Sequence, residues 1–199
     1  MSSSLRLGAY ILCGLVALFE LGVVWLLLHP DVPPDYRAYY IDKTPTCLNQ
    51  PVSGSYSLGA VIPFPPEGKD AAKPIRVCGW EGPTGDGTHA VGTSARLRFA
   101  YAEPATALTL HLSMVAVEKS GHLMPQRVEI VANGMLLDTV SLNAPTPQEF
   151  SLALPAPADG RVELGLRFPD AMQMGATDPD NRLRSIKLLS AALLPADQV

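Results

Sequence analysis

An apolar run near the N-terminus places the strongest constraint on how this chain can fold. It extends over 22 residues, from Leu7 to Leu28, and contains a single charged residue, Glu20. As a helix it would measure about 33 Å, enough to cross the ~30 Å hydrocarbon core of a bilayer. Tyr10 and Trp25 lie near its two ends, where amphipathic rings prefer the membrane interface. We therefore expect one transmembrane helix over residues 7–28.

A cleaved signal peptide is the alternative for this segment. Signal peptides have an apolar region of about 7–15 residues followed by a cleavage site with small residues. This run is longer and ends in WLLLHPDVPP, which offers no such site. No second apolar run of 18 residues follows, so the sequence predicts a single pass. Arg6 precedes the apolar run, and Arg37 and Lys43 follow it, so the numbers of positive charges on its two sides are nearly balanced and the positive-inside rule gives little guidance on orientation.

The cysteines help to orient the chain. Cys13 lies within the apolar run, so Cys47 and Cys78 remain as a pair in the rest of the sequence. A disulfide between them would close a loop of about 30 residues and stabilise the fold by about 3–4 kcal/mol; two separate buried thiols are the alternative. Disulfides persist in oxidising compartments. The sequence thus favours a bacterial inner-membrane protein with a cytoplasmic N-terminus (residues 1–6) and a periplasmic body.

The apolar run also carries a candidate docking face. Ala9, Cys13 and Ala17 are spaced by four residues and Glu20 follows three later, so all four fall on one side of a helix. Small side chains let another helix approach closely, and a polar residue there can form a hydrogen bond across the interface. A carboxyl group near the bilayer centre costs roughly 2.5–3.5 kcal/mol. We expect this face to dock on a polytopic membrane protein or on a second copy; a protonated glutamic acid tolerated by lipid is the alternative.

Beyond the helix, the sequence divides into a proline-rich linker over residues 29–54 and a body over residues 55–199. Nineteen prolines and sixteen glycines argue against a helical bundle and fit short strands joined by turns. Apolar residues alternate with polar ones over 95–101, 108–114, 150–154 and 162–168, and Asn133-Gly134 between two apolar runs is a hairpin signal. With further runs at 56–62, 75–80 and 186–194, about eight strands are expected, which predicts an all-β jelly-roll β-sandwich.

Composition and motifs exclude several functions. The formal net charge of −4 argues against a nucleic-acid partner. The histidines lack zinc-site spacing, and no nucleophile elbow or phosphate-binding glycine loop occurs. Asp178, Asp180 and Asn181 offer the oxygen ligands that Ca²⁺ prefers, although DPDN is also an ordinary turn sequence. We therefore assign no catalytic residue and no cofactor, and no metal site apart from this calcium candidate.

One short stretch combines residue types that suit a sugar. GWEGPTGDGTHAVG holds Trp80, Glu81, Asp86 and His89 within ten residues. Aromatic planes pack on the C–H faces of sugar rings, and carboxylates accept hydrogen bonds from hydroxyl groups. The alternative is that Trp80 belongs to the core at a strand end and that the rest is a solvated turn.

The body also resembles a known family. The resemblance depends on Gly79-Trp80-Glu81-Gly82-Pro83, Gly92, the alternating strand after it, Gln126-Arg127-Val128, Asn133-Gly134, Phe168-Pro169, Asp180-Asn181-Arg182 and the final strand at Ile186–Leu189. Over residues 55–195 this order is similar to the jelly-roll, carbohydrate-binding-module-like domains that accompany bacterial membrane glycosyltransferases and polysaccharide synthases. From that motif we add Arg182 to the candidate glycan ligands.

The resemblance implies a non-catalytic accessory subunit of a membrane glycosyltransferase or exopolysaccharide synthase. Its helix would dock on the enzyme, and its β-sandwich would lie over the periplasmic exit and contact nascent polysaccharide. A stand-alone, membrane-anchored carbohydrate-binding module is the alternative. A sugar hydrolase or esterase ranks last, because no strand places two carboxylates facing inward.

Overall fold

The computed structural model describes residues 3–29, 31–32, 36–37, 41, 47, 51–175 and 182–196. The chain forms two compact units, residues 1–33 and residues 34–199. The division falls within the segment that we expected to be a linker. We describe each unit by itself.

The first unit is the expected helix. α1 spans Ser3–Leu28, and its segment Arg6–Leu28 is long and apolar enough to cross a membrane. Its apolar side chains are exposed along its length. The helix ends at His29, whose ring stacks on Trp25 and whose Nδ1 lies 2.9 Å from the Trp25 carbonyl oxygen. Four of its residues, Ala9, Cys13, Ala17 and Glu20, lie within this continuous helix, and their spacing places them on one face.

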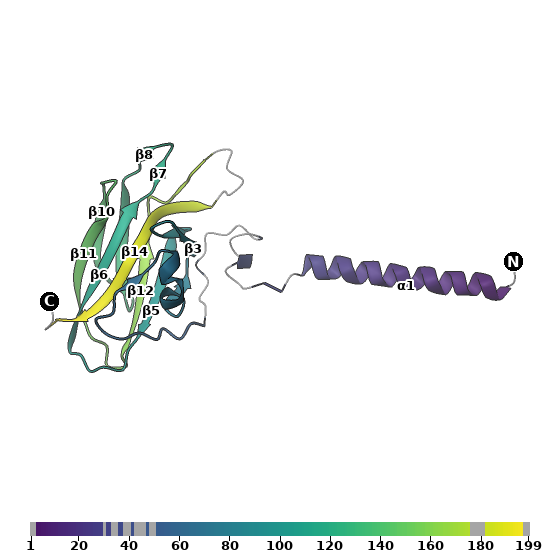
Figure 1. The fold of residues 1–199 in the computed structure, drawn as a ribbon, viewed down its shortest axis with the longest axis horizontal. Helices are drawn as coiled ribbons and strands as arrows, with labels where there is room; N and C mark the ends of the chain where they lie inside the picture. The colour runs from purple at the N-terminus through teal and green to yellow at the C-terminus, as the bar shows by residue number, and fades with distance from the viewer. Residues whose placement is uncertain are drawn as a thin grey trace. The chain divides into compact units, whose positions relative to one another are not determined.

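The second unit is a sandwich of two antiparallel sheets (Figure 1). One sheet has the order β11-β6-β14-β4-β3 and the other the order β10-β9-β12-β5-β2. The strand bounds are β2 Arg76–Cys78, β3 Trp80–Thr84, β4 Gly87–Val91, β5 Ser94–Ala100, β6 Ala107–Ala116, β9 Gln126–Ala132, β10 Met135–Leu142, β11 Gln148–Pro155, β12 Arg161–Arg167 and β14 Leu183–Pro195.

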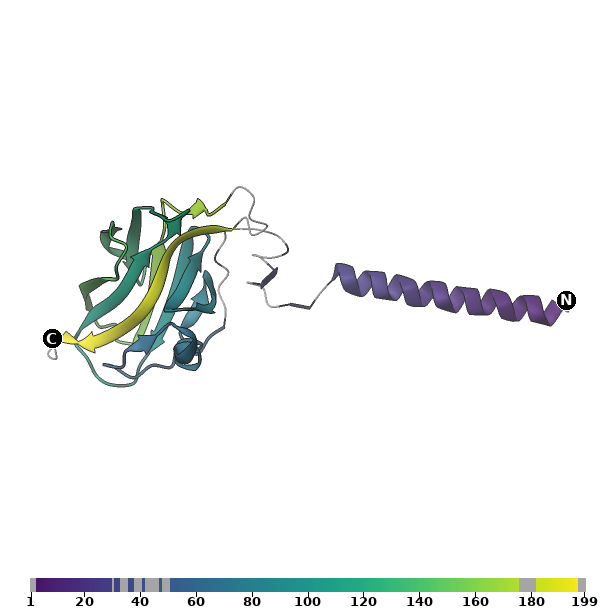
Figure 2. The same ribbon diagram turned by 45° about the horizontal axis from the view of Figure 1, so that its top comes forward.

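The strand order confirms the predicted jelly roll. Of the long strands, β4, β14, β6 and β11 share one sheet, and β5, β12, β9 and β10 share the other. Apart from the β9–β10 hairpin, successive long strands therefore cross between the layers in the double Greek-key pattern of a jelly roll. β14, yellow in Figure 2, pairs with β6 along one edge and with β4 and β1 (Ile62–Pro63) along the other.

Alternation explains which side chains fill the core. On β6, Leu108, Leu110, Leu112 and Met114 are at most 1% exposed, while the residues between them face outward. β5, β9 and β12 repeat this pattern, and their inward side chains meet those of β6 and β14 between the two sheets. The expected hairpin joins β9 to β10 through Asn133 and Gly134, both at positive φ, as a type I′ turn requires.

One hairpin was missed, and one strand prediction was wrong. The segment 80–91, expected to contain a solvated turn, forms the β3–β4 hairpin, which supplies an edge of the β14 sheet. Glycine and proline interrupt the alternation of apolar and polar residues in this hairpin. Gly87 is required by the packing, because a Cβ at this position would lie 2.5 Å from the Leu188 carbonyl oxygen. The segment 56–62 is mostly irregular, and only its last residue, Ile62, belongs to β1. The Tyr56 hydroxyl holds the beginning of this segment in place by donating a hydrogen bond to the Ala60 carbonyl oxygen and accepting one from the Leu193 N–H.

The smaller elements were not expected. They are the 3₁₀ helix η2 Pro66–Gly68, the helix α3 Lys69–Ala72, and the two-residue strands β7 Glu118–Lys119, β8 His122–Leu123 and β13 Met172–Gln173. They connect or flank the long strands and leave the two-layer architecture unchanged.

The predicted disulfide is confirmed. Cys47 and Cys78 are bridged, with their Cα atoms 5.4 Å apart and a sequence separation of 31. The bridge attaches residue 47 to β2, an edge strand of the β5 sheet. Cys13 is the free cysteine among the described residues.

Reduction of this bridge is expected to destabilise the sandwich. Opening a loop of this length removes about 3–4 kcal/mol from the free energy of unfolding in the chain-entropy model. Urea unfolding of the full chain, followed by the fluorescence of buried Trp80, measures the change with and without reductant. Cys13→Ser, which removes the free thiol, is the control and should keep the oxidised stability. Equal midpoints for the oxidised and reduced chains would contradict this prediction.

Candidate functional site

Four of the predicted ligand residues lie together on the outer face of the β3–β4–β14 region, namely Glu81, Asp86, His89 and Arg182. Glu81 on β3 accepts hydrogen bonds from Arg182, at 2.8 Å, and from Arg184, at 3.0 Å. Its own carbonyl oxygen accepts another from Arg76. The side chains of Glu81, Arg182 and Arg184 are largely buried, at 9–19% exposure. The Glu81 carboxylate is thus already engaged by two guanidinium groups.

Asp86 and His89 lie at the adjoining hairpin. Lys187 of β14 donates to Asp86 at 2.6 Å, and this hydrogen bond lowers the pKa of the Asp86 carboxyl. Burial lowers the pKa of His89, and the nearby positive charge of Lys187 lowers it further. The ring therefore favours its neutral form. Its buried Nδ1 has no hydrogen-bond partner among the described residues.

The structure supports the core alternative for Trp80. Its side chain is 7% exposed and lies beside Phe64, with ring centroids 5.9 Å apart. The indole N–H donates to the Arg96 carbonyl oxygen at 2.8 Å, which joins the two sheets at this edge. A buried ring offers no face for a sugar, so the stacking role proposed for Trp80 is corrected. The buried Trp80 side chain and the ion pairs of Glu81 together attach the β3–β4 hairpin to the neighbouring strands.

The sequence also predicted a candidate calcium site. Asp178, Asp180 and Asn181 fall outside the described residues. Within the described part of the chain, no group of three or more His, Cys, Asp and Glu side chains is placed to hold a metal ion.

The structure reveals a second candidate site, which the sequence analysis missed, on the outer face of the β5 sheet. Gly165 on β12 pairs with Arg96 on β5 and with Val131 on β9. Since paired residues share a face, all three point away from the core. They border a hollow of about 520 Å³, a size typical of ligand pockets. We call this hollow the Gly165 groove. It is lined by Cys47, Thr93, Ser94, Ala95, Arg96, Val131, Gly134, Glu163, Gly165, Leu166 and Arg167.

Gly165 leaves the floor of the groove open. A Cβ at this position would meet only Val131, at an ordinary contact distance of 3.8 Å, so no tight packing demands glycine. A glycine inside a strand often marks a place where a ligand or another backbone approaches closely. An outward glycine within the alternating run RVELGLRF was the signal in the sequence that could have identified this groove.

Polar side chains form the walls of the Gly165 groove. Arg96 is exposed, and the Arg167 side chain is 64% exposed. Glu163 is held in an ion pair by Arg98, which also donates to the carbonyl oxygen of Val52. Cys47 borders the groove because its disulfide partner Cys78 pairs with Arg96 across β2 and β5.

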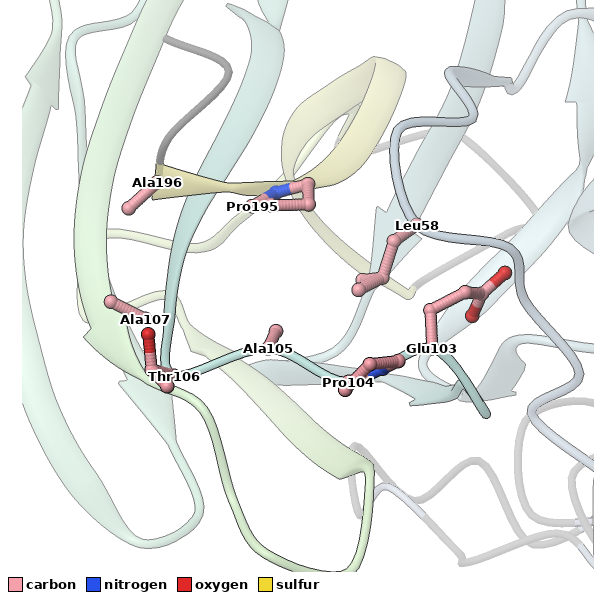
Figure 3. Close-up of a pocket in the computed structure, with 8 residues that line it drawn as sticks. All are labelled: Leu58, Glu103, Pro104, Ala105, Thr106, Ala107, Pro195 and Ala196. Atoms are coloured by element: carbon pink, nitrogen blue, oxygen red, sulfur yellow. The ribbon is translucent and has the colours of Figure 1, made fainter.

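A second hollow, of about 500 Å³, lies at one end of the sandwich. Figure 3 shows Pro195 and Ala196 opposite the stretch from Pro104 to Thr106, with Leu58 and Glu103 at one side. Small and apolar side chains dominate its lining, and among the described residues only Glu103 and Thr106 bring polar side chains. It offers fewer groups for recognising a polar ligand than the Gly165 groove does.

Comparisons with known proteins give similar structures but no relative by sequence. The sequence matches no family model, and no curated protein matches it. Among solved structures, it is similar to a CBM36 carbohydrate-binding module in complex with calcium and xylotriose, with 12% identity and a TM-score of 0.38 over 61% of this chain and 95% of that one. It is also similar to a CBM36 domain of a xylanase from the hindgut metagenome of Trinervitermes trinervoides, with 11% identity and a TM-score of 0.37 over 67% of this chain and 95% of that one.

A third similar structure is the sugar-binding EclA C-terminal domain, with 14% identity and a TM-score of 0.39 over 52% of this chain and 67% of that one. Scores in this range say nothing about ligand or partner. The fold follows from the strand order described above.

Loss of the Glu81 carboxylate is expected to weaken the β3–β4 attachment. Glu81→Gln removes a carboxylate that pairs with two largely buried guanidinium groups, which we expect to lower the free energy of unfolding by about 1–3 kcal/mol. Urea unfolding measures the effect. Asp86→Asn removes an ion pair whose acidic side chain is 63% exposed, and this control should cost less than about 1 kcal/mol. Equal losses in the two variants would show that the Glu81 cluster is not a structural anchor.

Proposed function

We propose that this chain is a non-catalytic, membrane-anchored glycan-binding module that serves as an accessory subunit of a membrane glycosyltransferase or polysaccharide synthase. The observation that carries the proposal is the Gly165 groove, an open, polar hollow on a sheet face. Its volume of about 520 Å³ and its mixed lining suit a segment of an oligosaccharide. The family resemblance of the sequence points the same way.

The lining of the groove matches the chemistry of sugars. Hydroxyl groups of a glycan need hydrogen-bond donors and acceptors, and Arg96, Ser94 and Glu163 supply both kinds. The apolar C–H faces of sugar rings need a flat surface without charge, and Gly165 and Val131 supply it on the groove floor. Recognition here would use hydrogen bonds more than aromatic stacking, because the lining contains no aromatic side chain among the described residues.

The groove supports binding more than catalysis. Glycoside hydrolysis commonly uses two carboxyl groups across the bond to be cleaved. Among the described residues that line the groove, Glu163 is the one acid, and it is paired with Arg98. The envelope hydrolase or esterase alternative therefore gains no support from this site.

The membrane location in this proposal follows from the helix and the disulfide. α1 has the length and hydropathy of a transmembrane anchor, and the Cys47–Cys78 bridge fits an oxidising compartment. We therefore propose that the chain is anchored in a bacterial inner membrane, with residues 1–6 in the cytoplasm and the sandwich in the periplasm. There the groove would meet polysaccharide as it leaves the enzyme.

Filling the groove is expected to abolish glycan binding without unfolding the protein. Gly165→Leu projects a side chain into the hollow, and the 3.8 Å distance to Val131 leaves room for its Cβ. We expect at least a tenfold loss of affinity for the glycans that bind the full chain, measured on an envelope-glycan array with the protein in nanodiscs. Thr109→Leu, on the outer face of the other sheet, is the matched control. Unchanged binding by Gly165→Leu would remove the groove from the proposal.

Docking of the helix is expected to depend on Glu20. Glu20→Leu removes a hydrogen bond within the membrane, and we expect recovery of a co-purified polytopic enzyme from mild detergent to fall about three- to tenfold. Leu15→Ala, on the opposite face of α1, is the control and should leave recovery unchanged. Equal recovery with Glu20→Leu and the unaltered chain would refute the docking face that contains Ala9, Cys13, Ala17 and Glu20.

A further inference from the structure

Positive charge is concentrated on the β5 sheet. All of its arginines lie on the outer face except Arg76, which pairs with core-facing Leu97 and donates to the Glu81 carbonyl oxygen on the other sheet. The five strands of this sheet carry six arginines and no lysine, against three carboxylates, in a chain whose formal net charge is −4. The arginines are Arg76, Arg96, Arg98, Arg127, Arg161 and Arg167, and the carboxylates are those of Glu129, Asp138 and Glu163. This face therefore has the opposite sign to the protein as a whole.

Ion pairs neutralise these arginines unequally. Arg98 is paired with Glu163, and Arg127 donates two hydrogen bonds to Asp170, which lower the pKa of Asp170 to about 2. In contrast, Arg167 and Glu129 are 3.7 Å apart and both well exposed, a pair that contributes little. Arg96 has no ion pair with a described residue.

Two of the weakly paired arginines, Arg96 and Arg167, border the Gly165 groove, whereas Arg161, which also has no ion pair with a described residue, lies outside its lining. Arg96 lies directly across from Gly165 on the neighbouring strand, and Arg167 lies two positions further along β12 on the same face. Neighbouring strands are about 4.8 Å apart, and residues i and i+2 are about 6.6 Å apart, so both long side chains reach the space above Gly165. Two guanidinium groups around one small hollow are suited to a planar anion such as a carboxylate.

We propose that the Gly165 groove binds an acidic polysaccharide and that Arg96 and Arg167 receive a carboxylate of one sugar unit. This inference rests on the proposed glycan-binding function and adds the ligand's charge class. The alternative anionic ligand near a membrane-anchored domain is a lipid membrane with negatively charged headgroups. The recessed shape of the site favours the polysaccharide, because a membrane headgroup layer needs an exposed basic surface.

The test compares matched acidic and neutral glycans. The full chain, in nanodiscs of neutral phosphatidylcholine, is titrated by calorimetry with oligomers of polygalacturonate, alginate and hyaluronan, and with the same oligomers after carboxyl reduction. We expect at least one acidic oligomer to bind at least tenfold more tightly than its reduced form, and we expect this preference to weaken as salt is raised. Arg96→Gln and Arg167→Gln should each lower the affinity for the acidic form about tenfold and lower the affinity for the neutral form much less. Arg161→Gln, on the same face but outside the groove lining, is the matched control.

The outcomes separate this inference from the proposed function. If reduced and acidic oligomers bind equally, and Gly165→Leu abolishes both, the glycan-binding function stands and the acidic preference is overturned. If no glycan binds but vesicles containing phosphatidylserine do, with loss in Arg96→Gln, the face is a lipid-binding surface and both proposals fail. Absence of binding to every oligomer and vesicle would also overturn both.

Discussion

Burial of alternate apolar side chains between two sheets is the interaction on which the rest of this structure depends. Leu97 and Phe99 on β5 and Leu110 and Leu112 on β6 are at most 1% exposed, and each lies between residues that face outward. Because a one-residue shift of register would reverse both faces, this burial fixes the register of every long strand. The positions of the outward residues, including Arg96 and Gly165, are fixed with it.

The β3–β4 hairpin is held to this core by polar contacts as well as packing. Trp80 joins the two sheets through its hydrogen bond to the Arg96 carbonyl, and Glu81 joins β3 to Arg184 on β14. The residues that resembled a sugar site in the sequence thus stabilise an edge of the sandwich. Carboxylates and aromatic rings serve binding and structure equally well, and burial decides between the two roles.

Particular residues show how far the sequence was informative. Strict alternation located β5, β6, β11 and β12, and Asn133-Gly134 located the β9–β10 turn. The β3–β4 hairpin was missed because Gly82, Pro83 and Gly87 interrupt its pattern. The Gly165 groove was missed because its lining comes from three strands and the disulfide-linked Cys47, which are brought together only by pairing across the sheet.

The sequence by itself determined the features that depend on neighbours along the chain. These are the length and hydropathy of α1, the spacing of its small residues and Glu20, and the inward and outward faces of the long strands, which follow from helical and strand periodicity. Tertiary structure alone decided the features that depend on contacts between distant residues. It buried Trp80, paired Glu81 with Arg182 and Arg184, and brought Arg96, Gly165 and Val131 side by side, because strand order and register set which residues meet.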